Sequence, residues 1–537
     1  MIKFISCIIL LLLIANIGLA QVEDTTYVEP PDTAQSYSGP DETVIKPKPK
    51  KSPARLSGDF GLYGEFYSVS DGDARRPSET GRLFLRPTLT LFGTFSASLD
   101  IIYSTEGSSA KQDINQFAVH PKWSWGTLHA GDFSHELSKY TMSGLNIRGA
   151  GVELYPGMLR FHAVGGQSKR KVEAGAYSSV YSQNAYGIKL GIGQEDKSYF
   201  DINFVRVKDN QNSLPVEIFQ VDSIEVDTTL TPDSTDTEQV PQNGITPEEN
   251  MAVSASTALK LFNRQLVFRG EFAGSAYTRN LYSTSEIGED IPSIVSNIYT
   301  PRTSSNFDYA YATELSYNQR VFNIRGGYTL IGPGYTSLGM TSNINDKQTL
   351  EGGLGFRLLR NKVALQGTFQ NQSDNVADQK TNTTTRTTIG VNAIIRPVNQ
   401  ISIALNTMQN VMKNDAADDS TWIVQDSIWN EQDSSWTEPD SVLYVGQIHN
   451  VNSSYSANIM YQFMMFNMNQ SLNANFSMQL SEDKNPARLR NDINTRNIMF
   501  AFMSMLSRSW SATANVSLNT VDLESQDKTS RTGLGLT

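Results

Sequence analysis

The stretch RLFLRPTLTLFGTFSASLDIIYS, residues 82–104, alternates apolar and polar side chains on both sides of a short turn at Phe92-Gly93. Before the turn, leucines share one face, and Arg86 lies on the other; after it, apolar residues alternate with serines and Asp100. Successive side chains of a β-strand point to opposite faces, so the pattern predicts two strands joined as a hairpin. The same alternation recurs in two further segments, 472–480 and 510–519.

The polar face of these strands is mostly Ser, Thr, Asn and Gln, with few charges. A soluble β-sandwich also alternates, but its polar face meets open solvent and is expected to carry more Lys and Glu. An uncharged polar wall beside a water-filled lumen is typical of an outer-membrane barrel, in which aromatic side chains gather at both membrane interfaces. The aromatic residues at expected strand ends are Tyr103, Phe161, Phe200, Phe356, Phe463 and Trp510.

Short and long connections alternate along the chain, as a barrel threaded from one side of a membrane requires. The short links are Phe92-Gly93, 124–126, Pro156-Gly157, 194–198, Asn263-Arg264, 318–320, Arg360-Asn361, 397–399, 465–467 and 504–508. The long links lie near 71–81, 105–114, 134–144, 168–182, 209–249, 279–306, 332–346, 373–382, 413–446, 482–488 and 522–529. We therefore predict an all-β fold over 57–537, a transmembrane antiparallel up-and-down β-barrel of about 22 strands with 20–24 as the range.

The N-terminus predicts export. Lys3 precedes an apolar run at 8–14 and a small-residue ending, Gly18-Leu19-Ala20, so residues 1–20 are expected to be a secretory signal peptide. The single cysteine excludes an intrachain disulfide, and its place before the apolar run argues against a lipoprotein. No later stretch is long and apolar enough for a membrane-spanning helix. We expect the cell outer membrane, with its lipid and the barrel-assembly machinery as partners and both termini in the periplasm.

Charge argues against a nucleic-acid partner. The chain has 44 Lys+Arg and 55 Asp+Glu, a net charge of −11, which becomes −12 when Lys3 leaves with the signal. Residues 21–56 are expected to be a Pro-rich periplasmic spacer that contains KPKPKKSP at 46–53. The basic strip 46–55 has two interpretations: a solvated leader, or a docking strip for a periplasmic partner or an envelope polymer.

A barrel of about 22 strands is wider than its side chains can fill, and the spacer is too short to form a plug. We therefore interpret the chain as a porin-like channel or conduit with an open or loop-constricted lumen, and not as an enzyme. Two alternatives stay open: a non-transporting surface binding or structural anchor, and an accessory barrel of protein secretion or surface assembly. The candidates for lining the lumen, whose mixed charges predict weak ion selectivity, are Arg86, Asp100, Arg160, Lys189, Asp201, Glu351 and Arg357.

The histidines do not predict a metal or catalytic site. His129 and His135 flank an expected strand end, and no glutamate supports them at helical spacing, so they are not expected to converge on an ion. Ser134, His162 and Asp132 offer the residue types of a hydrolase triad, without a spacing that joins them. We expect no metal, no cofactor and no catalytic residue, and interpret these side chains as polar lumen and rim residues.

Two long acidic loops are expected on the cell surface. Residues 209–249 hold ten acidic residues and 414–446 hold eight, with no Lys or Arg in either. The second repeats Asp-Ser-x-Trp every seven residues, at Trp422, Trp429 and Trp436. The β-branched neighbours favour extended chain, so we expect a folded hairpin rather than a coiled coil. Exposed tryptophans beside carboxylates suit a surface glycan, a protein or a calcium-assisted contact; the alternative is a self-packed hairpin.

Two further stretches are distinctive: Gly131-Asp132-Phe133 with SGLNIRGAGVEL at 143–154, and IGPGYTSLG at 331–339. They resemble large outer-membrane β-barrel proteins of Bacteroidota-type bacteria, and the first is also similar to usher-like secretion barrels. The resemblance implies an outer-membrane barrel and brings no catalytic residue. Such barrels usually end in an aromatic residue, whereas this sequence stops at Leu536-Thr537, so a truncated C-terminus is expected.

Overall fold

The computed structural model describes most of the chain beyond residue 52. The described residues are 53–69, 78–106, 115–173, 179–214, 245–285, 299–342, 344–416, 421–424, 428–430, 435–437, 442–445, 447–466, 468–485, 492–505, 507, 510–523 and 529–536. The predicted signal peptide, almost all of the spacer and most of the basic strip lie outside them, as do residues 215–244 of the first acidic loop.

Strands make up nearly all the regular structure of the described residues. They are β1 (Ala54–Phe66), β2 (Glu79–Leu91), β3 (Phe95–Ser104), β4 (Gln116–Trp123), β5 (Gly126–Ser134), β6 (Asn146–Leu154), β7 (Leu159–Lys169), β8 (Gln183–Gly193), β9 (Tyr199–Asp209), β10 (Glu249–Leu261), β11 (Leu266–Thr278), β12 (Ser305–Asn318), β13 (Phe322–Ile331), β14 (Lys347–Leu358), β15 (Val363–Ser373), β16 (Thr384–Ile395), β17 (Ile401–Asn414), β18 (Thr421–Val424), β19 (Ile428–Asn430), β20 (Ser435–Thr437), β21 (Val442–Val445), β22 (His449–Met465), β23 (Met468–Asp483), β24 (Ile493–Met505), β25 (Ser511–Leu523) and β26 (Thr529–Leu536). A single 3-10 turn, η2, occupies Gln211–Ser213 among them. No helix within the described ranges is long and apolar enough to cross a membrane.

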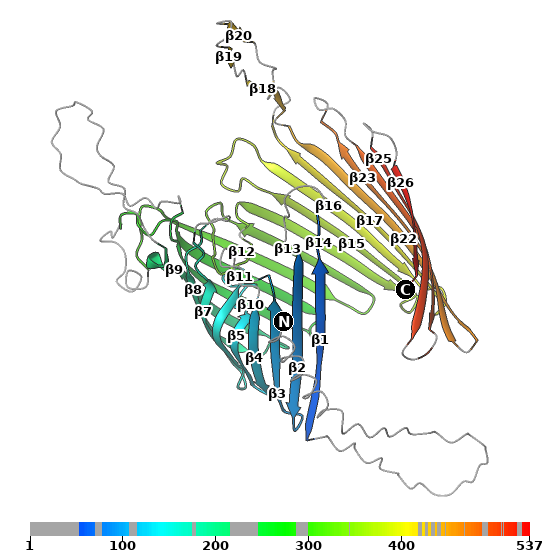
Figure 1. Ribbon diagram of the computed structural model, residues 1–537, viewed down its shortest axis with the longest axis horizontal. Helices are drawn as coiled ribbons and strands as arrows, with labels where there is room; N and C mark the ends of the chain where they lie inside the picture. Colours follow the sequence, from blue (N-terminus) through cyan, green and yellow to red (C-terminus); the bar gives the residue numbers. More distant parts are fainter. Residues whose placement is uncertain are drawn as a thin grey trace, which may run out of the picture. The chain divides into compact units, whose positions relative to one another are not determined.

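One antiparallel sheet contains 22 of these strands, and each pairs with its neighbour along the chain. β17 pairs with β22, and the four short strands between them form two separate hairpins. Figure 1 shows the succession from β1 in blue to β26 in red. β1 pairs with β2 and β26 with β25, so these two strands form the edges of the described sheet. The predicted all-β, antiparallel, up-and-down fold of about 22 strands is confirmed in strand number, direction and order.

The connections between strands alternate between short and long, as predicted. β2 and β3 are joined by a tight turn in which Phe92 and Gly93 have φ angles of 53° and 67°. Such left-handed backbone suits hairpin turns because it matches the twist of the flanking strands. Since every strand reverses direction, all long connections leave the sheet at one end and all short turns at the other.

The two faces of the sheet carry different side chains. On β8, Leu190 and Ile192 are 57% and 60% exposed, whereas Lys189 beside them is only 8% exposed. The cross-strand register carries this division to β9, where Ile202 lies opposite Leu190 and Asn203 opposite Lys189. Ile202 is 51% exposed and Asn203 is fully buried. We call these the apolar face and the polar face.

Two long connections fold back over the polar face and contact each other. The first inner loop comprises residues 135–145 and the second comprises 332–346. The Tyr335 hydroxyl of the second donates to the Tyr140 carbonyl of the first over 2.5 Å. The Ser337 hydroxyl donates to the carbonyl of Thr141, 2.6 Å away. The inner loops therefore form one layer.

This layer is fastened to the sheet through polar groups. Asn250 of β10 donates to the Thr336 carbonyl over 2.9 Å and accepts from the Leu338 N–H over 3.1 Å. The Tyr140 N–H donates to Glu271 of β11 over 3.1 Å. Buried side chains also pack between loops and sheet, in two clusters: Phe133, Leu137, Met142, Leu145, Ile147, Val164, Ala185, Val205 and Val207, and Tyr140, Ala273, Ala310, Ile331 and Tyr335. The buried hydrophobic clusters therefore lie between the inner loops and the polar face of the sheet.

The acidic loop at 414–446 contains two short hairpins outside the sheet. β18 pairs with β21, and β19 pairs with β20 so that Trp429 lies opposite Trp436 in register. The backbone therefore confirms the predicted hairpin rather than a coiled coil. Where the tryptophan side chains point stays a prediction.

Candidate functional site

A row of charged and imidazole side chains crosses the polar face from strand to strand. Asp100 on β3 faces His120 on β4, whose ring contacts His129 on β5. Glu153 on β6 then lies opposite His162 on β7. The row continues to Lys189 on β8, which lies opposite His162 of β7. We call this set the polar row.

Short hairpins bring these residues together. The turn between β4 and β5 pairs Trp123 with Gly126. The same register places His120 opposite His129, three residues away from the turn on each strand. The hairpin between β6 and β7 likewise sets Glu153 against His162. Because the residues lie on one face at matching depth, the site follows from register rather than from proximity in sequence.

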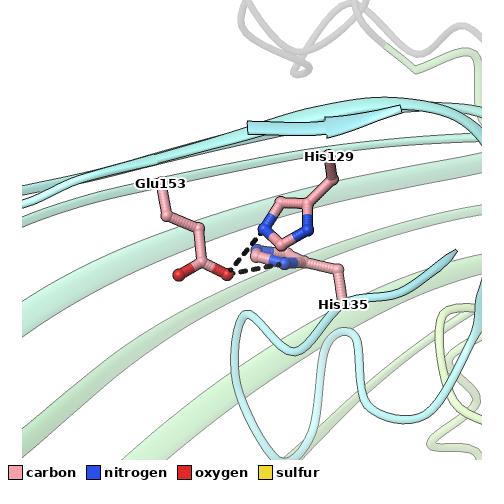
Figure 2. Close-up of side chains that lie close together, drawn as sticks. All are labelled: His129, His135 and Glu153. Carbon is pink, nitrogen blue, oxygen red and sulfur yellow. Dashed lines mark hydrogen bonds and ion pairs between the residues drawn. The ribbon is translucent and has the colours of Figure 1, made fainter. Parts of the chain in front are cut away.

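Glu153 is the centre of the polar row. Its Oε1 atom lies 3.2 Å from His129 Nε2 and 3.3 Å from His135 Nδ1. Figure 2 shows the two imidazoles approaching the same carboxylate oxygen, with His135 arriving from the chain beyond β5. His135 is the first residue of the first inner loop and is 4% exposed. The inner loop therefore folds back to contact the wall at Glu153.

The outer nitrogens of both imidazoles have partners as well. His129 Nδ1 is 2.9 Å from His120 Nδ1, and His135 Nε2 is 3.2 Å from His162 Nδ1. His120 Nε2 in turn lies 3.5 Å from the Asp100 carboxylate. Four of the five histidines of the chain thus form one connected network.

A buried ion pair adjoins this network. Arg160 on β7 donates through Nε and a terminal nitrogen to the two carboxylate oxygens of Asp201 on β9, at 2.7 and 3.1 Å. Lys189 lies 4.0 Å from the same carboxylate. The guanidinium also stacks 4.3 Å from the centre of the Tyr199 ring. Asp201 therefore offsets one of two buried positive charges, and removing it would leave both cations unpaired, which is costly.

Tyr155 closes the site at the short-turn end of β6. Its ring contacts His162 edge-on and lies beneath the Arg160 guanidinium. Burial is the largest influence on this phenol and, with the charge of Glu153, raises its pKa to about 12. Tyr155 therefore stays neutral across the physiological range.

The structure divides the seven predicted lining residues into three groups. Arg160, Lys189 and Asp201 come together, but they are 5%, 8% and 1% exposed, so they do not meet solvent as an open wall would require. Arg86 and Asp100 form a half-exposed pair at 3.4 Å. Glu351 and Arg357 form the third group and lie exposed on β14. The role of all seven residues in lining a lumen stays a prediction.

One expectation about the histidines is wrong. The sequence predicts that His129 and His135 do not converge, yet together with Glu153 they place three ligand-type atoms within 4.8 Å of one another. The supporting glutamate comes from the next strand, which helical spacing does not reveal. The triad residue types do not assemble around Asp132, whose carboxylate accepts from Arg148 at 2.6 Å and from the Phe117 N–H at 3.0 Å.

The chain matches no protein-family model. No curated protein sequence matches it either. Among solved structures it is similar to a bacterial polysaccharide outer membrane secretin, with 7% identity over 71% of this chain and 96% of that chain and a TM-score of 0.26.

Two further solved structures are similar. One is an E. coli P pilus tip assembly intermediate, PapC-PapD-PapK-PapG, with 10% identity over 94% of this chain and 63% of that chain and a TM-score of 0.35. The other is OmpT, an outer membrane protein of Vibrio cholerae, with 7% identity over 76% of this chain and 99% of that chain and a TM-score of 0.27. At these scores the architecture rests on the chain's own strand register, and the Bacteroidota-type resemblance stays a prediction.

Proposed function

We propose that this chain is an outer-membrane β-barrel that acts as a channel or conduit, with a passage narrowed by the two inner loops. The observation that carries the proposal is the contrast between the faces: both inner loops pack on the polar face, while residues such as Leu190 and Ile202 stay exposed on the other. An apolar surface repeated over so many strands requires a hydrocarbon covering. Lipid supplies that covering.

A strand structure in lipid must pair its backbone groups, which a closed barrel achieves. β1 and β26 are the first and last of 22 sequentially paired antiparallel strands, so they run in opposite directions and suit antiparallel closure. Closure would place the polar face and the inner loops inside. The long connections would then lie at the cell surface, and both termini would lie on the periplasmic side with the short turns.

The inner loops support a narrowed passage rather than a fully open one. They cover the wall around β8 to β11, where Asn203, Asn250 and Ala273 are fully buried. The half-exposed pair Arg86–Asp100 and the exposed Glu351 and Arg357 remain available to solutes. Opposite charges on this wall favour small polar solutes over strong selection for one ion sign.

Planar-bilayer recordings on the heat-modifiable, membrane-extracted protein test the proposal. The wild type should conduct weakly, and replacing 333–345 by a short Gly/Ser link should raise single-channel conductance because it removes half of the inner layer. A variant that lacks the tryptophan hairpins, residues 421–445, serves as the matched control and should conduct like the wild type. Recovery in the soluble periplasmic fraction, or no conductance from the 333–345 variant, would contradict a conduit.

A surface anchor is the second candidate function. Strands β18 and β21 pair with each other, as do β19 and β20, and none of the four pairs with the large sheet. The second pair places Trp429 opposite Trp436 in an acidic loop. That separation suits contact with a surface glycan or protein. Binding of such a partner by a non-conducting barrel would favour this candidate, and transfer of a protein substrate would favour the secretion accessory.

A further inference from the structure

We propose that His129, His135 and Glu153 form a binding site for a divalent transition-metal ion, for which Zn²⁺ is the test ion. The site joins two strands of the wall to the start of the first inner loop. It stands apart from the conduit proposal, because metal binding is measurable whether or not the barrel conducts.

The distances suit tetrahedral coordination. Zn²⁺ binds histidine nitrogen and carboxylate oxygen at about 2.0–2.1 Å, which sets neighbouring ligand atoms of a tetrahedron about 3.3 Å apart. Glu153 Oε1 lies 3.2 Å from His129 Nε2 and 3.3 Å from His135 Nδ1. All three ligand atoms lie within 4.8 Å of one another, so the two imidazole nitrogens would draw together by up to about 1.5 Å when an ion binds.

The hydrogen-bond network also assigns the right face of His129 to an ion. The Asp100 carboxylate lies 3.5 Å from His120 Nε2 and favours a proton on that nitrogen, which leaves His120 Nδ1 as an acceptor. His129 then donates to it through Nδ1, over 2.9 Å. The lone pair of His129 Nε2 consequently faces the carboxylate of Glu153, and two acceptors 3.2 Å apart require a cation or a proton between them.

The surroundings are those of a supported metal ligand. A metal-binding histidine usually donates its second ring N–H to a neighbouring group, which fixes the ring's orientation. His120 serves His129 in this way, and His162 Nδ1 lies 3.2 Å from the second nitrogen of His135. The adjacent cations Arg160 and Lys189 face the carboxylate of Asp201. Asp201 therefore offsets one of their two positive charges beside the site.

The ligand set selects the class of ion. Two imidazoles and one carboxylate suit Zn²⁺, Ni²⁺, Cu²⁺ or Co²⁺, whereas Ca²⁺ and Mg²⁺ prefer oxygen ligands. Three protein ligands leave a fourth position for water or for the second oxygen of Glu153. Since His135 begins the first inner loop, the bound ion would tie this loop to β5 and β6.

The test uses the full-length protein folded in detergent, free of any added histidine tag and stripped with a chelator. Zn²⁺ titration calorimetry should give one site per chain, and Co²⁺ should give the visible absorption of a tetrahedral complex. His135→Ala and Glu153→Gln should each weaken Zn²⁺ binding by more than about 100-fold, and His120→Phe, which removes a supporting partner, by about 10–100-fold. His449→Ala, a histidine on β22 far along the sheet, is the matched control and should bind like the wild type.

Heat-modifiability on gels verifies that each variant is folded before it is titrated. Folded His135→Ala or Glu153→Gln that binds Zn²⁺ as tightly as the wild type overturns the proposal. Equal loss of binding in His449→Ala overturns it too, since the ion would then be held by exposed histidines. If the ligand variants do not fold, the wild type decides alone: absence of the Co²⁺ tetrahedral spectrum is negative. Conductance plays no part in any of these readouts.

Discussion

Asp346 fastens the second inner loop to the connection between β15 and β16. Its carboxylate accepts from Lys380 over 2.5 Å and from the Val376 N–H over 2.7 Å, and its own N–H donates to the Gly332 carbonyl. Burial acts to raise the pKa of this carboxyl, but the hydrogen bonds from Lys380, Val376 and Asn375 outweigh it, so the pKa lies below its ordinary value. The anchor therefore depends on a charged carboxylate.

The first prediction follows from the sign of that shift. A lowered folded-state pKa stabilises the anchor above the unfolded value of about 3.9, and this contribution is lost as pH falls through the folded value. Asp346→Asn at neutral pH should loosen 332–346 and 374–383 by about 1 kcal/mol, seen as roughly fivefold faster hydrogen exchange there. Asp378→Asn, an exposed neighbour, is the control; unchanged exchange in Asp346→Asn would exclude the anchor.

Single residues were the hardest scale to predict from the sequence. Alternation predicts that Arg160, Lys189 and Asp201 face inward, because the period of two is a local property of the sequence. Alternation does not predict their burial, because burial depends on contacts between strands, such as those of Arg160 with Asp201 and with the Tyr199 ring. The pairing of His120 with His129 follows from the short turn between β4 and β5, but Glu153 reaches His135 only through the fold-back of the inner loop.

At the scale of elements, Gly339 lies where the second inner loop is in close contact with the backbone of the first. A Cβ atom there would lie 2.2 Å from the Thr141 carbonyl oxygen of the first inner loop. Gly339→Val should force the loops apart at a cost of about 1–3 kcal/mol. Single-channel conductance should rise while heat-modifiability persists. Gly274→Ala is the control, because a Cβ at Gly274 meets no atom within 4 Å; equal conductance in both variants would show that the loops do not narrow the passage.

The tryptophan loop is the element expected to be separable. β17 and β22 pair directly, up to Lys413 opposite His449, so the hairpins between them add no ladder bonds to the sheet. Shortening a long loop changes closure entropy by only about 1 kcal/mol. Replacing 421–445 by a short Gly/Ser link should leave insertion and heat-modifiability intact. If the loop is a binding site, glycan-array or cell-surface binding disappears with it, and substituting Trp422, Trp429 and Trp436 by Ala does the same. A barrel that cannot insert without the loop would contradict separability.

Strands were predictable and the inner loops were not. Alternation in 82–104 and the rhythm of short and long links depend on neighbouring residues, and they located β2, β3 and the order of the sheet. The sequence identifies 134–144 only as one of the long links, although it contains Leu137, Tyr140 and Met142, each at most 2% exposed in the fold. These apolar residues within a long link are the sequence signal for a loop that packs on the sheet.

At the scale of the whole molecule, closure between β1 and β26 remains to be tested by chemistry. Cys7 is the only cysteine in the sequence and lies in the predicted signal peptide, so introduced pairs would react without competition. We predict that a scan of cysteine pairs, one in Ala54–Phe66 and one in Thr529–Leu536, yields at least one disulfide in membranes, because adjacent strands bring Cβ atoms within bonding reach. The cross-link should appear as a gel shift that reductant reverses.

Leu518→Cys with Thr532→Cys provides the positive control for this scan, since these residues lie opposite each other on β25 and β26. Wild type, lacking a second cysteine, provides the negative one. If the control pair cross-links while every β1–β26 pair stays reduced in the membrane, the two edges do not meet. The backbone groups along β1 and β26 would then need partners from another chain, because unpaired strand edges are not tolerated in lipid. The monomeric barrel would have to give way to an assembly that closes through a second copy or a partner.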